Sequence, residues 1–279
     1  ISKNISKFLD KEFYSRKGSW HALIYCWRGG QRSRSLALVL NEIGWRISVL
    51  KGGYKNYRKL VLDELDDLGK YQFKIIQGQT GSAKTKILNC LCNMNAQVID
   101  LENLACHRGS LLGNEVNKKQ PSQRYFESLI HNTLEKFDHT KPIFIESESS
   151  KIGKLHLPKK LWLKLNESDR LLLNVPIDER IKFLLKEYKH LTKDSKLIMP
   201  FINGMKGKIA NEKLSNWTNL IQRKEWENFV KEILENHYDP KYIFSATKHM
   251  NKIKHKIDII KLDKLSIDNT SKKILDYFN

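Results

Sequence analysis

The chain has 279 residues, enough for one large domain or two ordinary ones with sizeable hydrophobic cores. Its 50 Lys and Arg outnumber its 31 Asp and Glu, and the net charge of +19 favours a polyanionic partner such as a nucleic acid. A lysine-rich compositional bias would explain part of the same excess. No apolar stretch is long enough to span a bilayer, so we expect a soluble, cytoplasmic protein. The four cysteines fit neither a disulfide framework nor a zinc site.

The first predicted strand, residues 21–25, leads into a loop that places a cysteine before two glycines and a helix. The loop reads Cys26-Trp27-Arg28-Gly29-Gly30-Gln31-Arg32-Ser33. Backbone N–H groups and the positive end of the helix, expected to begin near Ser33, converge on the sulfur. With Arg28 and Arg32 nearby, the thiol pKa is expected to fall from about 8.5 to between about 3.5 and 7.5. We therefore predict that Cys26 is a thiolate nucleophile; the alternative is an inert cysteine buried at a strand end.

A cysteine followed five residues later by Arg32 suits two chemistries, that of cysteine phosphatases and that of the larger-looped members of the rhodanese fold. The spacing alone does not choose between them. Residues 49–58 then predict a short strand, a turn at Gly52 and Gly53, and a helix, which is typical of the way rhodanese domains continue. We place a domain boundary in the charged stretch at residues 68–71, which gives a rhodanese-like domain over 1–69 and a second domain over 70–279.

A second anion-binding loop lies between a predicted strand, residues 73–76, and a predicted helix, residues 85–91. Its sequence matches the phosphate-binding pattern except at one position, where alanine replaces the last glycine: Gly78-Gln79-Thr80-Gly81-Ser82-Ala83-Lys84-Thr85. In this pattern backbone amides surround phosphates, Lys84 neutralises them and the Thr85 hydroxyl can ligate Mg²⁺. Ala83 lacks glycine's ready access to positive φ, which predicts weaker phosphate binding. The alternative is a glycine turn with a solvated lysine.

Acidic residues follow the next two predicted strands. Asp100 ends the strand at residues 97–100 and precedes an expected loop over 101–110, while Glu146 and Glu148 follow the strand at 142–145. An acid at the end of a strand beside a phosphate loop commonly holds Mg²⁺ or its water, so these residues are candidate metal ligands together with Thr85. Solvated strand ends are the alternative. Between the two strands, Ser122 predicts the start of a helix over 124–137.

Strands alternating with helices favour parallel α/β layers as far as a predicted strand at 170–174, which is followed by residues 175–180 and a long helix to about residue 191. Beyond this point the pattern is mostly helical, most clearly over 217–235, with a possible last strand at 242–244. Lysines of the tail predict either phosphate contacts or a solvated face, and we favour the solvated face. They are Lys248, Lys252, Lys254 and Lys256. Cys90 and Cys92, on the predicted helix after the phosphate loop, are expected in the core.

Taken in order over residues 21–180, these motifs resemble the tRNA 2-selenouridine synthases. The resemblance rests on the cysteine loop with the Gly52-Gly53 turn, the phosphate loop, and four further elements. These are Asp100-Leu101-Glu102, His107-Arg108-Gly109-Ser110, Gln120-Pro121-Ser122-Gln123 and Ile145-Glu146-Ser147-Glu148-Ser149. The fold that it implies is α/β: a partial rhodanese-like domain, then a P-loop NTPase-like parallel-sheet domain with a helical C-terminal part.

The resemblance also implies an activity on tRNA. Such enzymes convert wobble 2-thiouridine to 2-selenouridine by S-geranylation from geranyl diphosphate and then displacement with selenium from selenophosphate. It implies that Cys26 receives selenium, with Arg32 as its catalytic partner, and that Lys84 and Thr85 hold a diphosphate or phosphate, with Mg²⁺ possible. Further substrate-binding candidates are Arg28, His107, Arg108 and Ser110, with His107 either an acid–base group or a structural hydrogen bonder.

Two departures from the family pattern remain, the substitution at Ala83 and the start of the chain at Ile1. A whole rhodanese fold needs several elements before its cysteine, so we expect an N-terminally incomplete domain and weak selenium transfer. Three other functions stay open: a P-loop small-molecule or nucleotide kinase with a relic cysteine loop, supported by residues 175–180; a non-catalytic tRNA-binding remnant; and a cysteine phosphatase. The phosphatase is disfavoured because it leaves the phosphate loop without a role.

Overall fold

The structure is a computed structural model that describes residues 2–16, 19–28, 30–107, 119–193, 197–247 and 249–278. The chain divides into two compact units, Ile1–Glu64 and Leu65–Asn279. None of the helices within the described ranges is both long and apolar enough to cross a membrane.

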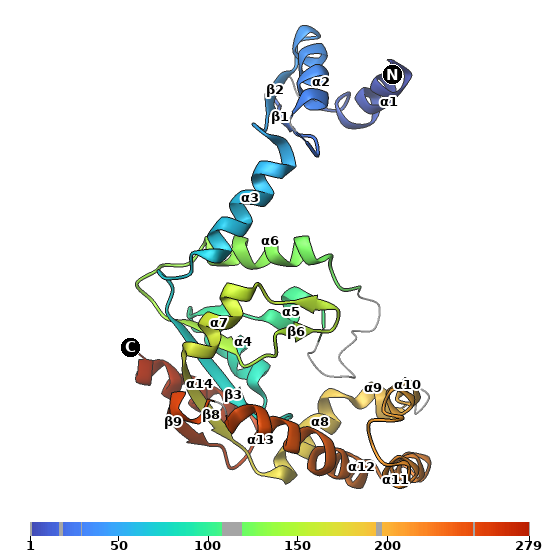
Figure 1. The fold of residues 1–279 in the computed structure, drawn as a ribbon, viewed down its shortest axis with the longest axis vertical. Helices are drawn as coiled ribbons and strands as arrows, with labels where there is room; N and C mark the ends of the chain where they lie inside the picture. Colours follow the sequence, from blue (N-terminus) through green and yellow to red (C-terminus); the bar gives the residue numbers. More distant parts are fainter. Residues whose placement is uncertain are drawn as a thin grey trace. The chain divides into compact units, whose positions relative to one another are not determined.

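The first unit is a small α/β layer around two parallel strands (Figure 1). Its elements are α1 Ser2–Glu12, β1 His21–Ile24, α2 Gln31–Glu42, β2 Arg46–Val49 and α3 Gly53–Asp66. The core combines Phe13, Ala22 and Leu40, and the rings of Trp20 and Trp45 meet Phe13 edge-on. The predicted order of strand, cysteine loop, helix, strand, glycine turn and helix is confirmed.

The glycine turn lies directly against the cysteine loop. Gly53 has φ +61°, and a Cβ at this position would clash with the carbonyl oxygen of Cys26. The same carbonyl accepts a hydrogen bond of 3.0 Å from the Tyr54 amide, and the Tyr54 ring stacks on Trp27 at 4.8 Å between centroids. Glycine is therefore required at residue 53, because this backbone carries the start of α3 against Cys26.

The second unit is built on a five-stranded sheet in which every pair of neighbours is parallel, as predicted for an α/β fold. The strand order is β4-β5-β3-β8-β9. The bounds are β3 Phe73–Gly78, β4 Gln97–Ile99, β5 Ile143–Glu146, β8 Asp169–Asn174 and β9 Ile253–Asp258. The chain leaves central β3 toward β4 at one edge and leaves β8 toward β9 at the other. The connections therefore diverge at the carboxyl ends of these strands, where α/β sheets form binding crevices.

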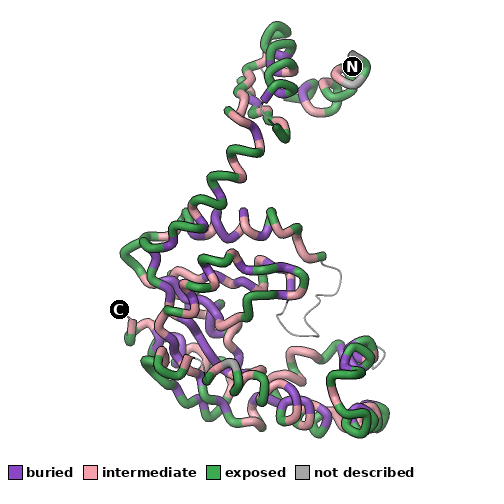
Figure 2. Tube along the Cα trace, viewed as in Figure 1, coloured by how far each residue is buried: buried purple, intermediate pink, exposed green. Residues whose placement is uncertain are grey.

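Helices cover the sheet and bury its apolar strands (Figure 2). Ile87 and Leu91 of α4 form one hydrophobic core with Phe144 of β5, Leu171 of β8 and Ile274 of α14. The remaining elements of this part are α4 Lys84–Asn93, α5 Leu101–Ala105, α6 Gln123–Leu134, the hairpin β6 Lys151–Ile152 and β7 Leu155–His156, α7 Lys159–Glu167 and α14 Lys264–Phe278. Ser122 accepts a hydrogen bond from the Tyr125 amide, so the predicted cap of α6 is confirmed.

The helical C-terminal part that the sequence predicted follows β8 and has its own core around Trp217. Its helices are α8 Ile177–Glu187, α9 Lys189–Lys193, α10 Met199–Gly204, α11 Asn211–Gln222, α12 Trp226–Ile233, the π-helical turn η2 Leu234–Tyr238, α13 Asp239–Thr247 and the 3-10 turn η3 Met250–Lys252. The helix expected over 217–235 is two helices, because the chain turns at Lys224, which has φ +61°.

Three other expectations were wrong. Residues 101–105 form a helix rather than a loop, because the Asp100 side chain caps it. Residues 242–244 belong to α13, and the last strand is β9, inside the lysine-rich tail. There Ile257 is buried among core residues while Lys254, His255 and Lys256 are exposed, as expected for a strand at the edge of the sheet. Cys92 is exposed rather than in the core.

Gly53→Ala is expected to loosen the junction between the glycine turn and the cysteine loop. The left-handed backbone would cost roughly 1–2 kcal/mol, and the clash with the Cys26 carbonyl adds to it. Hydrogen exchange of the Tyr54 amide should therefore become at least about tenfold faster. Gly44→Ala is the control, because Gly44 also has positive φ but its Cβ would meet nothing within 4 Å. Equal exchange at Tyr54 in both variants would show that the contact with Cys26 is unimportant.

Candidate functional site

Cys26 lies in the loop between β1 and α2, partly exposed, where the backbone turns at Gly30. Its pKa is lowered from 9.0 to about 7, first by the hydroxyl and then by the backbone N–H of Ser33, with a smaller contribution from the Gly30 N–H. Ser33 is buried in the first turn of α2, and its hydroxyl donates a hydrogen bond to the Gly30 carbonyl at 3.0 Å. The predicted direction of the shift is confirmed, and about half of the thiol is ionised at neutral pH.

The side chains of the two arginines expected to lower this pKa are not among its main causes, although Arg28 contributes through its backbone. The guanidinium groups of Arg28 and Arg32 are absent from the causes of the shift, and both residues are exposed. Hydrogen bonds at a helix N-terminus therefore account for most of the lowered pKa of the thiol, and the side chains of both arginines are exposed.

The phosphate loop connects β3 to α4. Gly81 has φ +87° and Ala83 has φ +58°, so alanine adopts the left-handed conformation that the sequence led us to doubt. Ala83 is almost fully buried and its carbonyl accepts the first hydrogen bond of α4, from Ile87 at 3.0 Å. The loop geometry is therefore kept at a cost of roughly 1–2 kcal/mol relative to glycine.

The loop is closed by bonds within itself. The Ser82 amide donates to the Gln79 carbonyl at 3.1 Å, and the Ser82 hydroxyl donates to the same oxygen. The Lys84 ammonium donates to the Gly78 carbonyl at 2.9 Å and faces the groove described below. A Cβ at Gly78 would lie 2.7 Å from the Ser82 hydroxyl oxygen, so this position requires glycine.

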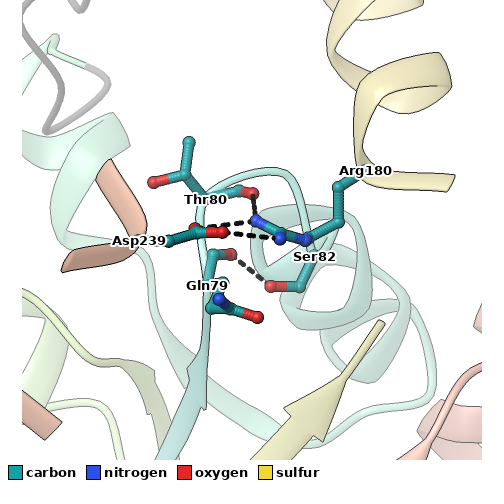
Figure 3. Close-up of polar contacts among 5 residues, drawn as sticks. All are labelled: Gln79, Thr80, Ser82, Arg180 and Asp239. Atoms are coloured by element: carbon teal, nitrogen blue, oxygen red, sulfur yellow. Dashed lines mark hydrogen bonds and ion pairs between the residues drawn. The ribbon is translucent and has the colours of Figure 1, made fainter. Parts of the chain in front are cut away.

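A buried arginine on α8 holds the outer side of the loop (Figure 3). Arg180 donates to the Thr80 carbonyl at 3.2 Å and pairs with both carboxylate oxygens of Asp239 on α13, at 2.9 and 2.8 Å. Its backbone and Cβ also leave no room at Gly81, where an added Cβ would lie 3.1 Å from them. The loop is thus fixed between α4 and the helical part.

An open groove of about 800 Å³ runs along the phosphate loop and the carboxyl ends of the neighbouring strands. All the phosphate-loop residues singled out in the sequence line it: Gly78, Thr80, Gly81, Ser82, Ala83, Lys84 and Thr85. Asp100, His107 and Glu146 line it too, so the structure brings these predicted residues together. Arg108 and Ser110 lie outside the described residues. Cys26 and Arg32 belong to the first unit.

Three carboxylates meet in this groove. Oxygen atoms of Glu102, Glu146 and Glu148 lie within 4.8 Å of one another. Glu146 is buried, and its pKa is raised well above 4.5, mainly by burial and then by Glu102, Glu148 and Asp100. Burial also raises the pKa of Glu148 to about 7, against the opposing attraction of Lys84. One oxygen of Glu146 has no hydrogen-bond partner among the described residues.

These carboxylates fit a hard divalent cation. Mg²⁺ prefers carboxylate oxygens, and a cation would compensate both the mutual repulsion of the acids and the unsatisfied oxygen of Glu146. Asp100 has a different task, because its side chain accepts the Asn103 amide at 2.8 Å and caps α5. Sequence reasoning missed Glu102, which the helix starting after Asp100 carries into the cluster; a cap before an acid at the second helical position was the available signal.

Two more groove residues were not singled out from the sequence. Arg170 on β8 is buried and donates to the side chains of Gln77 and Ser147 and to a backbone carbonyl. Lys241 on α13 contacts the ring of His237 at 3.3 Å. Neither had a motif to reveal it, since both reach the groove only through the fold. Burial lowers the pKa of His107, which favours a neutral ring at pH 7.

Ser33→Ala is expected to raise the Cys26 pKa from about 7 toward 9.0, because the largest contribution to the thiolate's stability is lost. The midpoint of Cys26 alkylation against pH should move upward, and the rate at pH 7 should fall several-fold, as read by peptide mass analysis. Ser35→Ala is the matched control on the same helix, since its hydroxyl bonds only to the Gln31 carbonyl. An unchanged midpoint in Ser33→Ala would reject this origin of the shift.

A family profile described as the tRNA 2-selenouridine synthase AAA domain matches residues 71–199, which include the phosphate loop and the carboxylates. Among solved structures, a shikimate kinase from Bacteroides thetaiotaomicron aligns with 74% of this chain and 97% of its own, with a TM-score of 0.36 and 11% identity. That similarity is too distant to bear on function.

Curated relatives match over most of the chain. A tRNA 2-selenouridine synthase from Sulfurovum sp. (strain NBC37-1) is 31% identical over 261 residues, covering 83% of this chain and 70% of the relative. One from Marinobacter nauticus is 29% identical over 259 residues, covering 82% of this chain and 69% of the relative. These matches agree with the resemblance seen in the motifs. The chain belongs to the tRNA 2-selenouridine synthase family of tRNA-modifying enzymes.

Proposed function

We propose that this enzyme converts wobble 2-thiouridine of tRNA to 2-selenouridine in two steps that use different loops. In the first step the tRNA sulfur takes the geranyl group of geranyl diphosphate. In the second step selenium from selenophosphate displaces the geranylthio group. The observation that carries the proposal is the groove in which Lys84 of the phosphate loop faces the carboxylate cluster, in a chain that also holds an activated thiol.

The phosphate loop would bind the diphosphate of the first step. Breaking the bond between the geranyl carbon and oxygen leaves negative charge on the diphosphate, while the sulfur forms the new bond to carbon. Lys84 and the amides of Gly81 to Ala83 would hold that charge more strongly in the transition state than in the ground state. Lys84 is well placed because its ammonium already lies at the Gly78 carbonyl at the mouth of the loop.

Mg²⁺ would be held by Glu102, Glu146 and Glu148, with Thr85 and Asp100 lining the same groove. When bound, the ion would supply a Lewis acid beside the diphosphate. Lys84 lies close enough to Glu146 and Glu148 to lower both of their pKa values, so the carboxylates and the loop act in one electrostatic environment.

Cys26 would receive the selenium donor, selenophosphate, for the second step, in which selenium bonds to the base carbon, geranylthiolate leaves, and water cleaves the remaining Se–P bond and releases phosphate. A pKa of about 7 supports this role, since a large fraction of the sulfur is thiolate at neutral pH. Arg28 and Arg32, exposed near the cysteine, would attract the selenophosphate anion or tRNA phosphates. His107 in the groove is proposed as a substrate contact, and the same role is proposed for Arg108 and Ser110.

The tRNA would be bound mainly through its phosphates. The net charge of +19 supports this mode of binding, in which affinity falls steeply with salt because counterions are released.

Glu146→Gln is expected to stabilise the metal-free protein near pH 8. The pKa of Glu146 is higher in the folded state than its value near 4.5 in the unfolded chain. The protonated carboxyl of Glu146 therefore stabilises the fold fully below pH 4.5, and this stabilisation is lost as pH rises through the folded pKa. A glutamine side chain does not titrate, so the variant does not lose stability in this way. Mg²⁺ should raise the melting temperature of the wild type by about 2–4 °C for each kcal/mol by which its binding stabilises the fold. It should leave the melting temperature of Glu146→Gln unchanged.

Glu135→Gln, at an exposed position after α6, is the matched control and should respond to Mg²⁺ as the wild type does. An equal response to Mg²⁺ in Glu146→Gln and wild type would argue against a metal at this cluster.

Mass analysis of 2-thiouridine tRNA incubated first with geranyl diphosphate and then with selenophosphate tests the whole proposal. The wild type should yield a geranylated product and then a selenium product. Lys84→Ala should lose the geranylated product by about 100-fold or more, as expected when one transition-state charge contact is removed. Cys26→Ser should still geranylate but make no selenium product.

Lys160→Ala, an exposed lysine on α7, and Cys92→Ser, an exposed cysteine on α4, control for loss of charge and of thiol. Both should behave as the wild type. No geranylation by a folded wild-type chain that binds tRNA would contradict the proposal.

A further inference from the structure

A second cavity lies in the helical part of the second unit, next to the groove. It has a volume of about 80 Å³ and is walled mainly by aliphatic and aromatic side chains of α8, α12 and η2. They include Leu184, Leu185, Val230 and Leu234. None of the described residues that line it carries a charge and most of them are apolar, so the cavity suits a hydrocarbon.

The cavity and the groove are neighbours. Thr80, Leu184, Tyr188 and Tyr238 line both of them, so one side of the cavity is the wall of the groove. Leu184 lies at the phosphate loop itself, because a Cβ built on Gly81 would be 3.1 Å from its Cδ1. A ligand whose phosphates occupy the phosphate loop would therefore have the apolar side chain of Leu184 next to those phosphates.

Hydrogen bonds hold in place the residues between the phosphate loop and the cavity. Arg180, one turn before Leu184 on α8, holds the Thr80 carbonyl at 3.2 Å and is itself paired with Asp239. A simple packing gap could occur anywhere in the helical core around Trp217, whereas this one adjoins the end of the loop.

We propose that this cavity binds the hydrocarbon end of an alkyl diphosphate whose phosphates lie on the phosphate loop. The inference rests on the proposed function, in which that ligand is geranyl diphosphate. The cavity is about half the 150 Å³ of an engineered apolar cavity that binds benzene, so it takes the far end of the chain while the rest lies along Leu184 and Tyr188. Burial of that end makes binding depend on the hydrocarbon as well as on the diphosphate.

The test is calorimetric titration of the full chain, with Mg²⁺ present, by inorganic diphosphate and by the dimethylallyl, geranyl and farnesyl diphosphates. The wild type should bind geranyl diphosphate more tightly than inorganic diphosphate. Val230→Trp, at a half-buried position that fills the cavity, should weaken geranyl diphosphate binding by about tenfold, the factor for about two CH₂ groups left unburied. Its binding of inorganic diphosphate should stay within about twofold of the wild type.

Leu185→Trp fills the cavity from α8 and replaces the first variant if that one does not fold. Ile243→Trp is the matched control, since Ile243 is exposed on α13 and lies outside the cavity lining. Equal losses for inorganic and geranyl diphosphate, or no loss for either, would overturn the inference. Transfer of the geranyl group to tRNA is measured in parallel. If the wild type transfers the group but Val230→Trp binds geranyl diphosphate as tightly as the wild type does, only the cavity proposal is rejected. If the wild type does not transfer the group, the proposed function is rejected.

Discussion

The buried ion pair between Arg180 and Asp239 is the interaction on which the arrangement of the second unit depends. One guanidinium joins the phosphate loop, through the Thr80 carbonyl, to two helices that are 59 residues apart in sequence. Removing either partner would leave a buried charge uncompensated, a loss of about 3–5 kcal/mol. The pair therefore fixes both the outer edge of the loop and the wall shared by the groove and the apolar cavity.

A second constraint is the balance of charge in the groove. Glu146 and Glu148 are kept close together where burial disfavours their ionisation, and Lys84 is the cation that opposes this effect. The carboxylates of this site can bind a metal ion, and the Lys84 ammonium can bind a phosphate. A divalent cation would relieve the repulsion among the carboxylates, and an anionic ligand would pair with Lys84, which is the electrostatic arrangement expected for chemistry on a diphosphate.

Local signals allowed much of this structure to be predicted from sequence. The loop over residues 78–85 and the cap at Ser122 follow from a few adjacent residues, and both are present. Contacts between distant segments could not be predicted. Glu102 joins the carboxylates only because residues 101–105 form a helix, and a short apolar segment such as 242–244 is compatible with strand or helix until its tertiary packing is known.

The most direct test of the account is a titration of the protein with inorganic diphosphate, with and without Mg²⁺, on the wild type and on Lys84→Ala. If the phosphate loop and the carboxylates form one site, the wild type should bind diphosphate more tightly when Mg²⁺ is present. Lys84→Ala should bind it at least about tenfold more weakly, since a charge-assisted contact is lost. Binding that is indifferent to both Mg²⁺ and Lys84 would contradict the account.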